Sequence, residues 1–356
     1  MNIKEELGLF KAKIEPELKV FLDKAIKSSK ENNFITTGAL QQVKKITLSG
    51  GKRLRPALMY WGYMGVGGKD EKEIIKTSVS IELIHIFLLI HDDIIDNDPK
   101  RHGVETIHCK YKKLGRMIAK GKRDSTHFGN SIGIVVGDIV NALGNRVLFD
   151  SKFDAALIIK ALSRLQDIIA RVAVGEAQDV FIEHSRVANE KEVLDMYKNK
   201  TAKYTIEGPL HLGAILGGAS DELLSKISNF AVPIGVAFQI QDDILGIFGD
   251  EQKIGKPVGS DIREGKQTLL VVRALKNATK SQKEILHSLI GKKDITLAEI
   301  EEFRDIVRKT KALEYANTLA KKLIAEGKAE LANIGFDKKT EKILLALADY
   351  MAKREI

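Results

Sequence analysis

Two groups of aspartates carry the clearest chemical signal in the sequence. Asp92, Asp93 and Asp96 follow an almost wholly apolar stretch. Residues four apart share a helical face, so a helix here presents Asp92 and Asp96 together, with Asp93 one step around. Carboxylates this close repel one another and need a cation, and hard oxygen ligands with room for water and phosphate suit Mg²⁺. Taken alone, the cluster is also compatible with a solvated acidic helix end, although acidic charge at a helix C-terminus opposes the helix dipole.

A second group follows another apolar stretch, residues 223–240. It consists of Gln239, Asp242 and Asp243. Two such helices facing one cavity would hold metals on both sides of a diphosphate, an arrangement that promotes departure of a phosphate leaving group. The two groups together therefore predict metal-assisted diphosphate chemistry.

Such a site also needs cationic side chains for the remaining phosphate oxygens. The segment 50–56 places two glycines, which permit close backbone approach, ahead of Lys52 and Arg55. It lacks the spacing of a Walker loop and the Ser or Thr after its Lys, so nucleotide hydrolysis is disfavoured. Lys200 precedes Thr201 on another expected helix, and a Gly-rich loop runs between Lys256 and Lys266.

The elements that must position these groups are expected to be helices. Only six prolines occur in 356 residues, and the stretches between them are rich in Ala, Leu, Ile, Lys and Glu. We expect one all-α domain over residues 1–356, without an interdomain linker or a solenoid repeat. The expected helices lie near 2–29, 35–47, 53–64, 72–97, 127–150, 153–184, 189–216, 220–248, 263–278, 281–291, 297–309, 311–333 and 338–353.

Charge and composition leave several partner classes open. Lys and Arg outnumber Asp and Glu by 57 to 48, and 44% of residues are apolar, enough for a sizeable core. A net charge of +9 permits nucleic acid, an anionic membrane or a polyanionic small substrate. The cations are scattered rather than interleaved with aromatic residues, which disfavours nucleic acid.

The compartment is predicted from cysteine usage and from hydropathy. A single cysteine, Cys109, excludes an intramolecular disulfide and favours a reducing cytoplasm. Residues 1–11 are charged and lack the apolar core of a signal peptide. The strongest apolar run, 81–90, is broken by Glu82 and His85 and is far short of the roughly 20 residues that span a bilayer. No transmembrane segment is expected.

Several motifs, in order from about Gly50 to Lys266, resemble the trans-prenyl diphosphate synthase (polyprenyl synthetase) family. The resemblance implies an isoprenoid-synthase-type helical bundle around a deep central cavity, three Mg²⁺ ions with substrate bound, and a homodimer. Besides the two aspartate groups, the matching segments are 51–56, 101–103, 137–138, 175–179, 200–202, 255–257 and 261–266.

The family pattern also implies roles for individual residues. Asp92 and Asp96 match the aspartates that bind Mg²⁺ bridging the allylic diphosphate, with Asp93 in support, and Asp242 and Asp243 match the second metal-binding motif. Positions that contact the allylic diphosphate or place its metals match Arg101, Lys200, Thr201, Gln239 and Lys256, with Lys266 in the same late basic region. The pocket for isopentenyl diphosphate matches Gly51, Lys52, Arg55 and His85.

Three positions depart from the family pattern. His102 stands where a second arginine for isopentenyl diphosphate is common, so this contact is expected to be weaker or pH-sensitive. Gly246 replaces the frequent third aspartate of the second motif, so the distal metal is expected to rely on Asp242 and Asp243 with water. Glu176 stands where glutamine is frequent.

The implied reaction is head-to-tail condensation by ionisation, condensation and elimination. The double bond of isopentenyl diphosphate attacks the allylic cation, and the released diphosphate takes the final proton, so no side-chain nucleophile is expected. The Thr201 hydroxyl offers a dipole to the allylic cation. Phe87, five residues before Asp92, would lie about 7.5 Å deeper along a helix. An aromatic residue here, with Leu88 beside it, resembles archaeal-type geranylgeranyl diphosphate synthases. A twenty-carbon product is therefore expected, with a farnesyl or mixed-length product as the alternative.

Other function classes share some of these features. A class I terpene cyclase or a head-to-head condensing enzyme also uses paired aspartate groups, but neither requires the predicted isopentenyl diphosphate site at Gly51, Lys52 and Arg55. A non-catalytic regulatory subunit often loses aspartates of the first group, and all three are present here. A basic helical nucleic-acid-binding protein is the remote alternative.

Overall fold

The structure is a computed structural model that describes residues 2–29, 34–120, 123–249 and 259–352. The described residues are almost entirely helical, as predicted, and divide into two compact units. The N-terminal unit comprises residues 2–162 and 212–218, and the C-terminal unit comprises residues 163–211 and 219 onward. The expectation of one domain over the whole chain stays a prediction.

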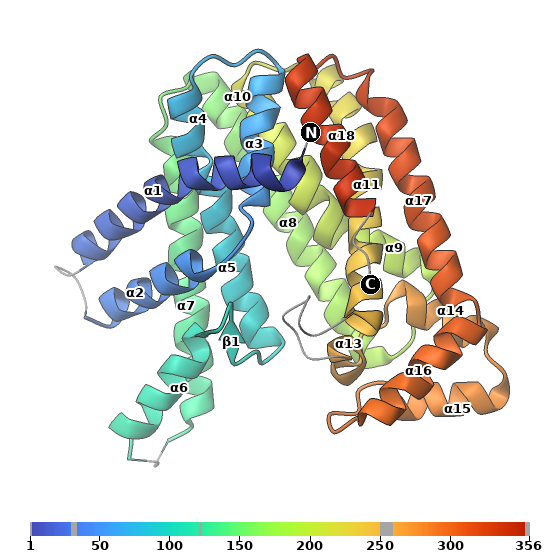
Figure 1. The fold of residues 1–356 in the computed structure, drawn as a ribbon. Helices are drawn as coiled ribbons and strands as arrows, with labels where there is room; N and C mark the ends of the chain where they lie inside the picture. Colours follow the sequence, from blue (N-terminus) through green and yellow to red (C-terminus); the bar gives the residue numbers. More distant parts are fainter. Residues whose placement is uncertain (1, 30–33, 121–122, 250–258, 353–356) are drawn as a thin grey trace. The chain divides into compact units, whose positions relative to one another are not determined.

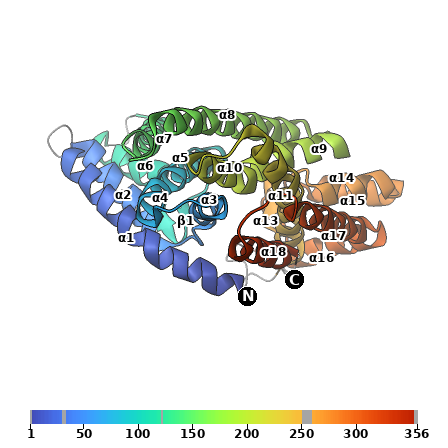
Figure 2. The same cartoon turned by 90° about the horizontal axis from the view of Figure 1, so that it is seen from above.

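The N-terminal unit holds the helices that carry the first aspartate group. Within it, α1 and α2 lie side by side (Figures 1 and 2), and α7 packs along both α5 and α6. Its helices are α1 (Ile3–Ser29), α2 (Phe34–Ser49), α3 (Leu54–Gly65), α4 (Glu71–Thr77), α5 (Val79–Ile95), α6 (Ile107–Ile118) and α7 (Ser125–Phe149), followed by the start of α8 (Ala155–Ser185).

Glycines on one face of α7 explain how closely it packs. Gly129, Gly133 and Gly137 are spaced four apart, and a Cβ atom on any of them would overlap atoms of α5 or α6. Gly137 lies against the ring of His91 on α5, whose Nε2 atom is 3.1 Å from the Ile134 carbonyl oxygen of α7. This contact fixes α7 beside the C-terminal turns of α5.

The C-terminal unit holds the helices that carry the second aspartate group. In it α11 packs along α17 (Figure 1) and also against a π-helix, η1. Its elements are the rest of α8, α9 (Glu190–Tyr197), η1 (Lys198–Glu207), the start of α10 (Gly208–Leu216), α11 (Asp221–Phe248), α13 (Ser260–Glu264), α14 (Leu269–Asn277), α15 (Lys280–Leu289), α16 (Leu297–Lys309), α17 (Ala312–Leu331) and α18 (Lys338–Ala352).

The sequence prediction of the elements was wrong in four places. The expected helix 72–97 is two helices that meet at Ser78, and the expected helix 189–216 contains η1. The expected helix 263–278 is interrupted, because Gly265 adopts a positive φ and Thr268 caps a new helix. Helix α6 and a two-stranded hairpin, β1 (Lys100–Arg101) and β2 (Val104–Glu105), were not predicted.

Within the described ranges, three helical stretches are long and apolar enough to cross a bilayer by length and composition alone. They are Glu71–Ile95, Ser125–Phe149 and Asp221–Phe248, and their most apolar windows are 67%, 39% and 50% buried. The sequence argument considered only an uninterrupted apolar run and so underestimated their length. The expectation of no transmembrane segment stays a prediction, supported by the aspartate pairs inside two of these helices, because carboxylates are costly in a bilayer.

Candidate active site

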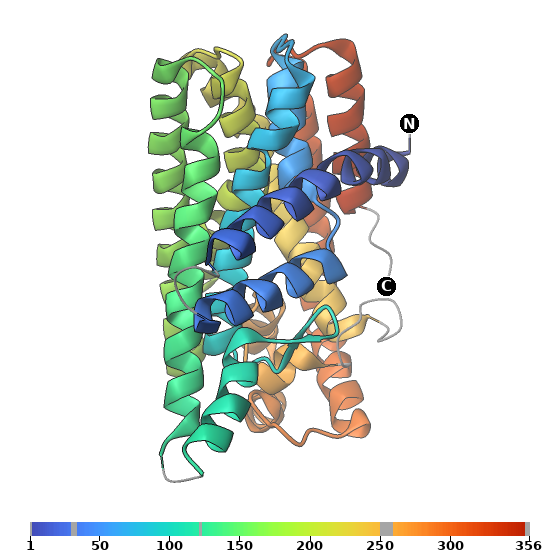
Figure 3. The same ribbon diagram turned by 90° about the vertical axis from the view of Figure 1, so that its left-hand side faces the viewer.

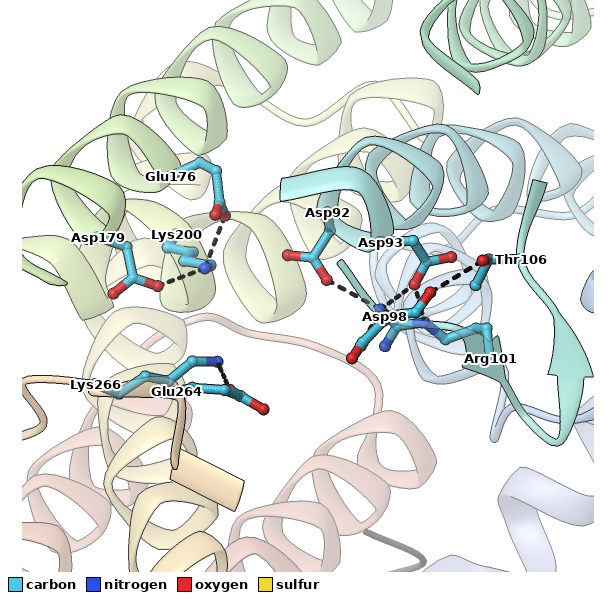
Figure 4. A network of polar contacts seen from close by, with 10 residues as sticks. All are labelled: Asp92, Asp93, Asp98, Arg101, Thr106, Glu176, Asp179, Lys200, Glu264 and Lys266. Atoms are coloured by element: carbon cyan, nitrogen blue, oxygen red, sulfur yellow. Dashed lines mark hydrogen bonds and ion pairs between the residues drawn. The ribbon is translucent and has the colours of Figure 1, made fainter. Parts of the chain in front are cut away.

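The first aspartate group lies at the C-terminal end of α5 and is organised by one arginine. Arg101 on β1 donates from Nε to Asp93 Oδ1 at 2.7 Å and from a terminal nitrogen to Asp92 Oδ2 at 3.1 Å (Figure 4). The same nitrogen also bonds Asp93 Oδ1 and lies 3.4 Å from Asp98 Oδ2. Asp96 is the C-cap residue of α5. The unpredicted β1–β2 hairpin therefore brings Arg101 to the aspartates.

The two adjacent aspartates of this group have different environments. Asp93 is buried, whereas a quarter of the Asp92 side chain is exposed. Burial raises the pKa of Asp93 to about 7 against the opposing effect of Arg101, and the charges of Asp92 and Asp98 make smaller contributions in the same direction as burial. Asp92 is thus the accessible member of the pair, and Asp93 holds the arginine.

The residues predicted to bind isopentenyl diphosphate gather in the same unit. Burial, followed by the charges of Arg55, Arg101 and His102, lowers the pKa of His85 well below its ordinary value, so this imidazole is neutral. A Cβ atom on Gly50 would lie 2.7 Å from the His102 ring, which places the glycine loop directly against that side chain.

Arg53 is an important residue of this loop that the sequence reasoning missed. Its guanidinium is buried and donates to Glu82 on α5 at 2.6 Å, to Glu15 on α1 at 3.2 Å and to the Thr47 carbonyl oxygen on α2 at 2.5 Å. Glu82 was treated only as a break in an apolar run. A charged residue in an otherwise apolar helix was the available signal, because a buried carboxylate requires a cationic partner.

The second aspartate group is joined to η1 by a chain of hydrogen bonds. Gln239 Nε2 donates to Asp243 Oδ1 at 2.8 Å, and the Thr201 hydroxyl donates to Gln239 Oε1 at 2.6 Å. The Tyr197 hydroxyl donates to the other oxygen of Asp243 and accepts from the Leu269 amide at 2.8 Å. Asp243 is buried and Asp242 is partly exposed. The structure therefore brings together three of the predicted residues, and Tyr197 is an addition.

Lys200 projects from η1 between two carboxylates of α8. Its Nζ atom lies 2.7 Å from Glu176 Oε2 and 2.6 Å from Asp179 Oδ2 (Figure 4). Gly175 makes this approach possible, because a Cβ atom there would lie 2.6 Å from the Lys200 amide nitrogen. Glu176 stands where glutamine is frequent in the family. Its carboxylate pairs with the Lys200 ammonium, whereas an uncharged glutamine would not neutralise that charge.

The late basic region is described in part. Lys266 lies 3.0 Å from Glu264 at the end of α13 (Figure 4). Lys256, with Gly255 and Pro257, lies outside the described residues.

Gly246 has a direct structural counterpart in Asp261. A Cβ atom on Gly246 would overlap the carboxylate of Asp261 on α13. The same carboxylate is close enough to Asp243 that, after burial, it is the largest cause of the raised pKa of Asp243. The sequence reasoning expected only Asp242, Asp243 and water here, and it missed this third carboxylate.

The predicted chain-length residues lie on α5. Phe87 is buried, and its ring meets the ring of His91 edge-on at 4.9 Å. Leu88, four residues before Asp92 and so on the same helical face, is partly exposed.

The carboxylate chemistry fits magnesium. Among the described residues, no three His, Cys, Asp or Glu side chains converge as a metal site. Magnesium does not require such a cage, because it usually keeps several waters and takes one or two carboxylates together with substrate phosphates. Asp92 and Asp242, the accessible oxygen donors of each group, meet that requirement.

The chain is similar over nearly its whole length to proteins that handle prenyl diphosphates. The family model described as "Polyprenyl synthetase" matches residues 38–307. The chain belongs to the polyprenyl synthetase family. The geranylgeranyl diphosphate synthase of Saccharolobus solfataricus is 36% identical over 309 residues, covering 86% of this chain and 87% of that protein. The short chain isoprenyl diphosphate synthase of Methanocaldococcus jannaschii is 34% identical, covering 96% and 94%.

Solved structures agree with this membership. A geranylgeranyl pyrophosphate synthase from Corynebacterium glutamicum, complexed with isoprenyl diphosphate and magnesium, matches with a TM-score of 0.90 and 30% identity. The match covers 97% of this chain and 99% of that one. As a polyprenyl synthetase, the chain is a prenyltransferase with the isoprenoid-synthase fold and short-chain trans-prenyl diphosphate synthase activity.

Proposed function

We propose that the protein makes a twenty-carbon geranylgeranyl diphosphate by successive head-to-tail additions of isopentenyl diphosphate to an allylic primer. Phe87, five residues before Asp92 on α5, is the observation that supports this length, together with the relatives named as geranylgeranyl synthases. Its ring is held by His91, which is itself fixed against α7. A fixed ring limits chain growth better than a mobile one does. A fifteen-carbon or mixed-length product is the competing possibility.

Product sizing tests this proposal. The protein is incubated with Mg²⁺, isopentenyl diphosphate and each allylic primer in turn, and the products are dephosphorylated and sized. The twenty-carbon alcohol should be the dominant product with every primer that the enzyme accepts. Dominant farnesol, or dominant twenty-five-carbon alcohol, contradicts the assignment.

We predict that Phe87→Ala lengthens the product, because removing the ring opens space below the aspartates. Leu88→Phe should do the reverse and shift the product toward fifteen carbons. Phe153→Ala serves as the control, because Phe153 is an aromatic residue of the same unit that packs on Tyr63 and lies outside α5. Unchanged product length in Phe87→Ala would show that this residue does not limit the chain.

We propose that both aspartate groups act on the same diphosphate. The magnesium ions, three in number with substrate bound, would be held by Asp92 and Asp96 and, in the other unit, by Asp242 with Asp243 and Asp261. Magnesium supplies charge neutralisation of the departing diphosphate. Arg101, Lys200, Lys256 and Lys266 would bind its remaining oxygens, while Thr201 and Gln239 orient the reacting end. Gly51, Lys52, Arg55, His85 and His102 would bind isopentenyl diphosphate.

This assignment is tested by neutral isosteres at the accessible aspartates. Asp92→Asn and Asp242→Asn should each lower kcat by about a thousandfold or more, because each removes a charged metal ligand. Asp150→Asn, which alters an exposed aspartate paired with Arg146, is the control. Near-normal turnover in either site variant would show that the substituted aspartate is not a metal ligand.

We also propose a homodimer with twofold symmetry and a cytoplasmic location. Exposed apolar side chains on α7 and α8 support the dimer. Sedimentation of Val135→Glu and Phe181→Glu should show monomers, whereas Leu297→Glu, an equally exposed leucine on α16, should not alter the mass. The exposed large apolar residues of α7 and α8 are Ile134, Val135, Phe149, Ile159, Val174, Val180 and Phe181.

A further inference from the structure

Helix α6 ends in an exposed surface that contains none of the candidate site residues. We call this surface the basic-apolar tip, and define it as Lys113, Leu114, Arg116, Met117, Ile118 and Lys120. In Figure 3, α6 lies beside the first turns of α7, and its C-terminal end points away from α1 and α2.

The apolar residues of α6 become exposed toward its C-terminal end. His108, Tyr111 and Gly115 are buried on one face. Toward the C-terminal end of the helix, Met117 is 75% exposed, Ile118 is 64% exposed and Leu114 is 37% exposed. Although α6 packs on α7, Met117 and Ile118 therefore leave most of their apolar surface exposed.

The same stretch is strongly basic. Residues 107–120 contain five Lys or Arg and no Asp or Glu, in a chain whose whole net charge is +9. One of the five, Lys110, turns inward and donates to α2 at Gln42 Oε1. Lys113 pairs with Glu105 yet remains 72% exposed, and Arg116 donates to the Ser125 hydroxyl at 3.3 Å. The exposed face of α6 therefore combines cations with aliphatic side chains.

We propose that the basic-apolar tip docks the enzyme on an anionic lipid bilayer. A helix with Lys and Arg beside exposed aliphatic residues lies in the plane of a membrane interface, where the aliphatic groups enter the acyl boundary and the cations meet lipid phosphates. Long basic side chains suit this position, because their stems lie along apolar surface while their charges stay in the headgroup layer.

Charge and side-chain chemistry favour lipid over other anionic or apolar partners. Single-stranded nucleic acid is bound through aromatic stacking platforms, and the tip presents Met, Ile and Leu instead. A second copy of the chain meeting the tip about a twofold axis would bring its cations against identical cations. An anionic bilayer satisfies both the charge and the aliphatic surface.

The proposal stands apart from product length and from metal binding. It draws only on the exposure and charge of α6. A failure of the vesicle experiment below would therefore leave the proposed function untouched.

Vesicle co-sedimentation of the full-length enzyme tests the proposal. Vesicles of phosphatidylglycerol and phosphatidylcholine are compared with vesicles of phosphatidylcholine alone, at low and at high salt. The enzyme should bind the anionic vesicles and release as salt rises, because exposed charges are screened. Replacing Lys113, Arg116 and Lys120 together by Gln should weaken binding by about a hundredfold.

A second variant separates the apolar contribution from the charge. Met117→Ser with Ile118→Ser should weaken vesicle binding at least about tenfold, with unchanged turnover of water-soluble substrates as the test of folding. Leu297→Ser, which removes a 71% exposed leucine elsewhere, should bind normally.

Several outcomes would overturn the proposal. One is equal binding to neutral vesicles, and another is no binding to either kind. A third is unaltered binding in both tip variants. A gel-shift with nucleic acid that the tip variants abolish, or a change in oligomeric mass in those variants without a change in vesicle binding, would instead assign the tip to nucleic acid or to a second copy.

Discussion

At the scale of single residues, Asp261 fills the space that Gly246 leaves open. The second aspartate motif lacks the third carboxylate common in the family, and a carboxylate from α13 lies against the glycine Cα instead. The carboxylate is thus supplied from a different element of the chain. This exchange could not be predicted from spacing, because residues 246 and 261 are separated by a segment whose path the pattern does not define.

We predict that Gly246→Ala lowers activity by at least about tenfold and raises the Mg²⁺ concentration needed for half-maximal rate. The added methyl group would overlap the Asp261 carboxylate and displace it from Asp243. Gly246→Asp should be no better, because it adds a like charge in the same place. Magnesium titration of initial rates measures both effects.

The matched control is Gly218→Ala. Gly218 has open space around it but a positive φ, so the substitution should lower stability and leave the Mg²⁺ dependence of the rate unchanged. A normal magnesium titration in Gly246→Ala would show that Asp261 takes no part in metal binding.

Tyr197 gives a second prediction at this scale. Its hydroxyl joins the buried Asp243 carboxylate to the Leu269 amide, so Tyr197→Phe leaves two buried polar groups each short of a partner. We expect a loss of about 2 to 3 kcal/mol in the free energy of unfolding. Tyr315→Phe, whose hydroxyl bonds the more exposed Glu190, should lose less in the same denaturation experiment. Equal losses would argue against a special role for Tyr197.

At the scale of elements, Arg53 connects four helices. It begins α3 as the N-cap residue and bonds α1, α2 and α5 through Glu15, Thr47 and Glu82. Lys52 and Arg55 flank it in the chain, so this ion pair also positions the loop proposed to bind isopentenyl diphosphate. Its φ of 53° is in the left-handed region, a conformation that the buried ion pair helps to hold.

We predict that Arg53→Met destabilises the protein by about 3 to 5 kcal/mol, because it leaves the Glu82 carboxylate buried without a cation. Arg53→Met combined with Glu82→Met should recover most of that loss, since the buried charge is then absent. Lys328→Met, which breaks an exposed pair with Asp349, should change stability by less than about 1 kcal/mol. Denaturant unfolding of all three variants measures these differences, and a double variant as unstable as Arg53→Met would contradict the explanation.

Most long helices could be predicted from the sequence, because their apolar residues recur at helical spacing over three or more turns. The positions of Asp92 and Asp242 at the ends of apolar helices followed from the same pattern. Helix α6 was missed because basic residues and Gly115 mask its buried residues. The partners of the site residues were also missed, because Arg53 with Glu82 and Gly246 with Asp261 are contacts between distant segments, which local periodicity does not encode.

At the scale of the whole molecule, a buried histidine makes stability depend on pH. Burial lowers the pKa of His211 on α10 to about 4 from an ordinary 6.5, and its Nε2 atom lies 2.9 Å from the Leu224 carbonyl oxygen. Above pH 6.5 the imidazole is neutral in both folded and unfolded chains. Between pH 6.5 and 4 the unfolded chain binds a proton that the folded chain resists, so stability falls as the pH falls.

We predict that this single group removes about 3 kcal/mol of stability by pH 4, of which about 2 kcal/mol is lost by pH 5. His211→Gln should reduce the loss of stability between pH 6.5 and 5. His127→Gln, at an exposed histidine, should leave that loss unchanged. Denaturant unfolding at several pH values measures the slope. An equally steep fall in His211→Gln would assign it to other groups.

The π-helix η1 has a consequence for how the enzyme tolerates change. A π-helix closes each hydrogen bond over one residue more than an α-helix does, so η1 accommodates extra length between α9 and α10. Deleting one residue from it would allow α-helical winding to resume and would turn Lys200 or Thr201 away by about a quarter of a revolution. A loop on the surface can lose one residue without loss of activity. Along η1, a one-residue deletion should leave a folded protein that no longer makes product.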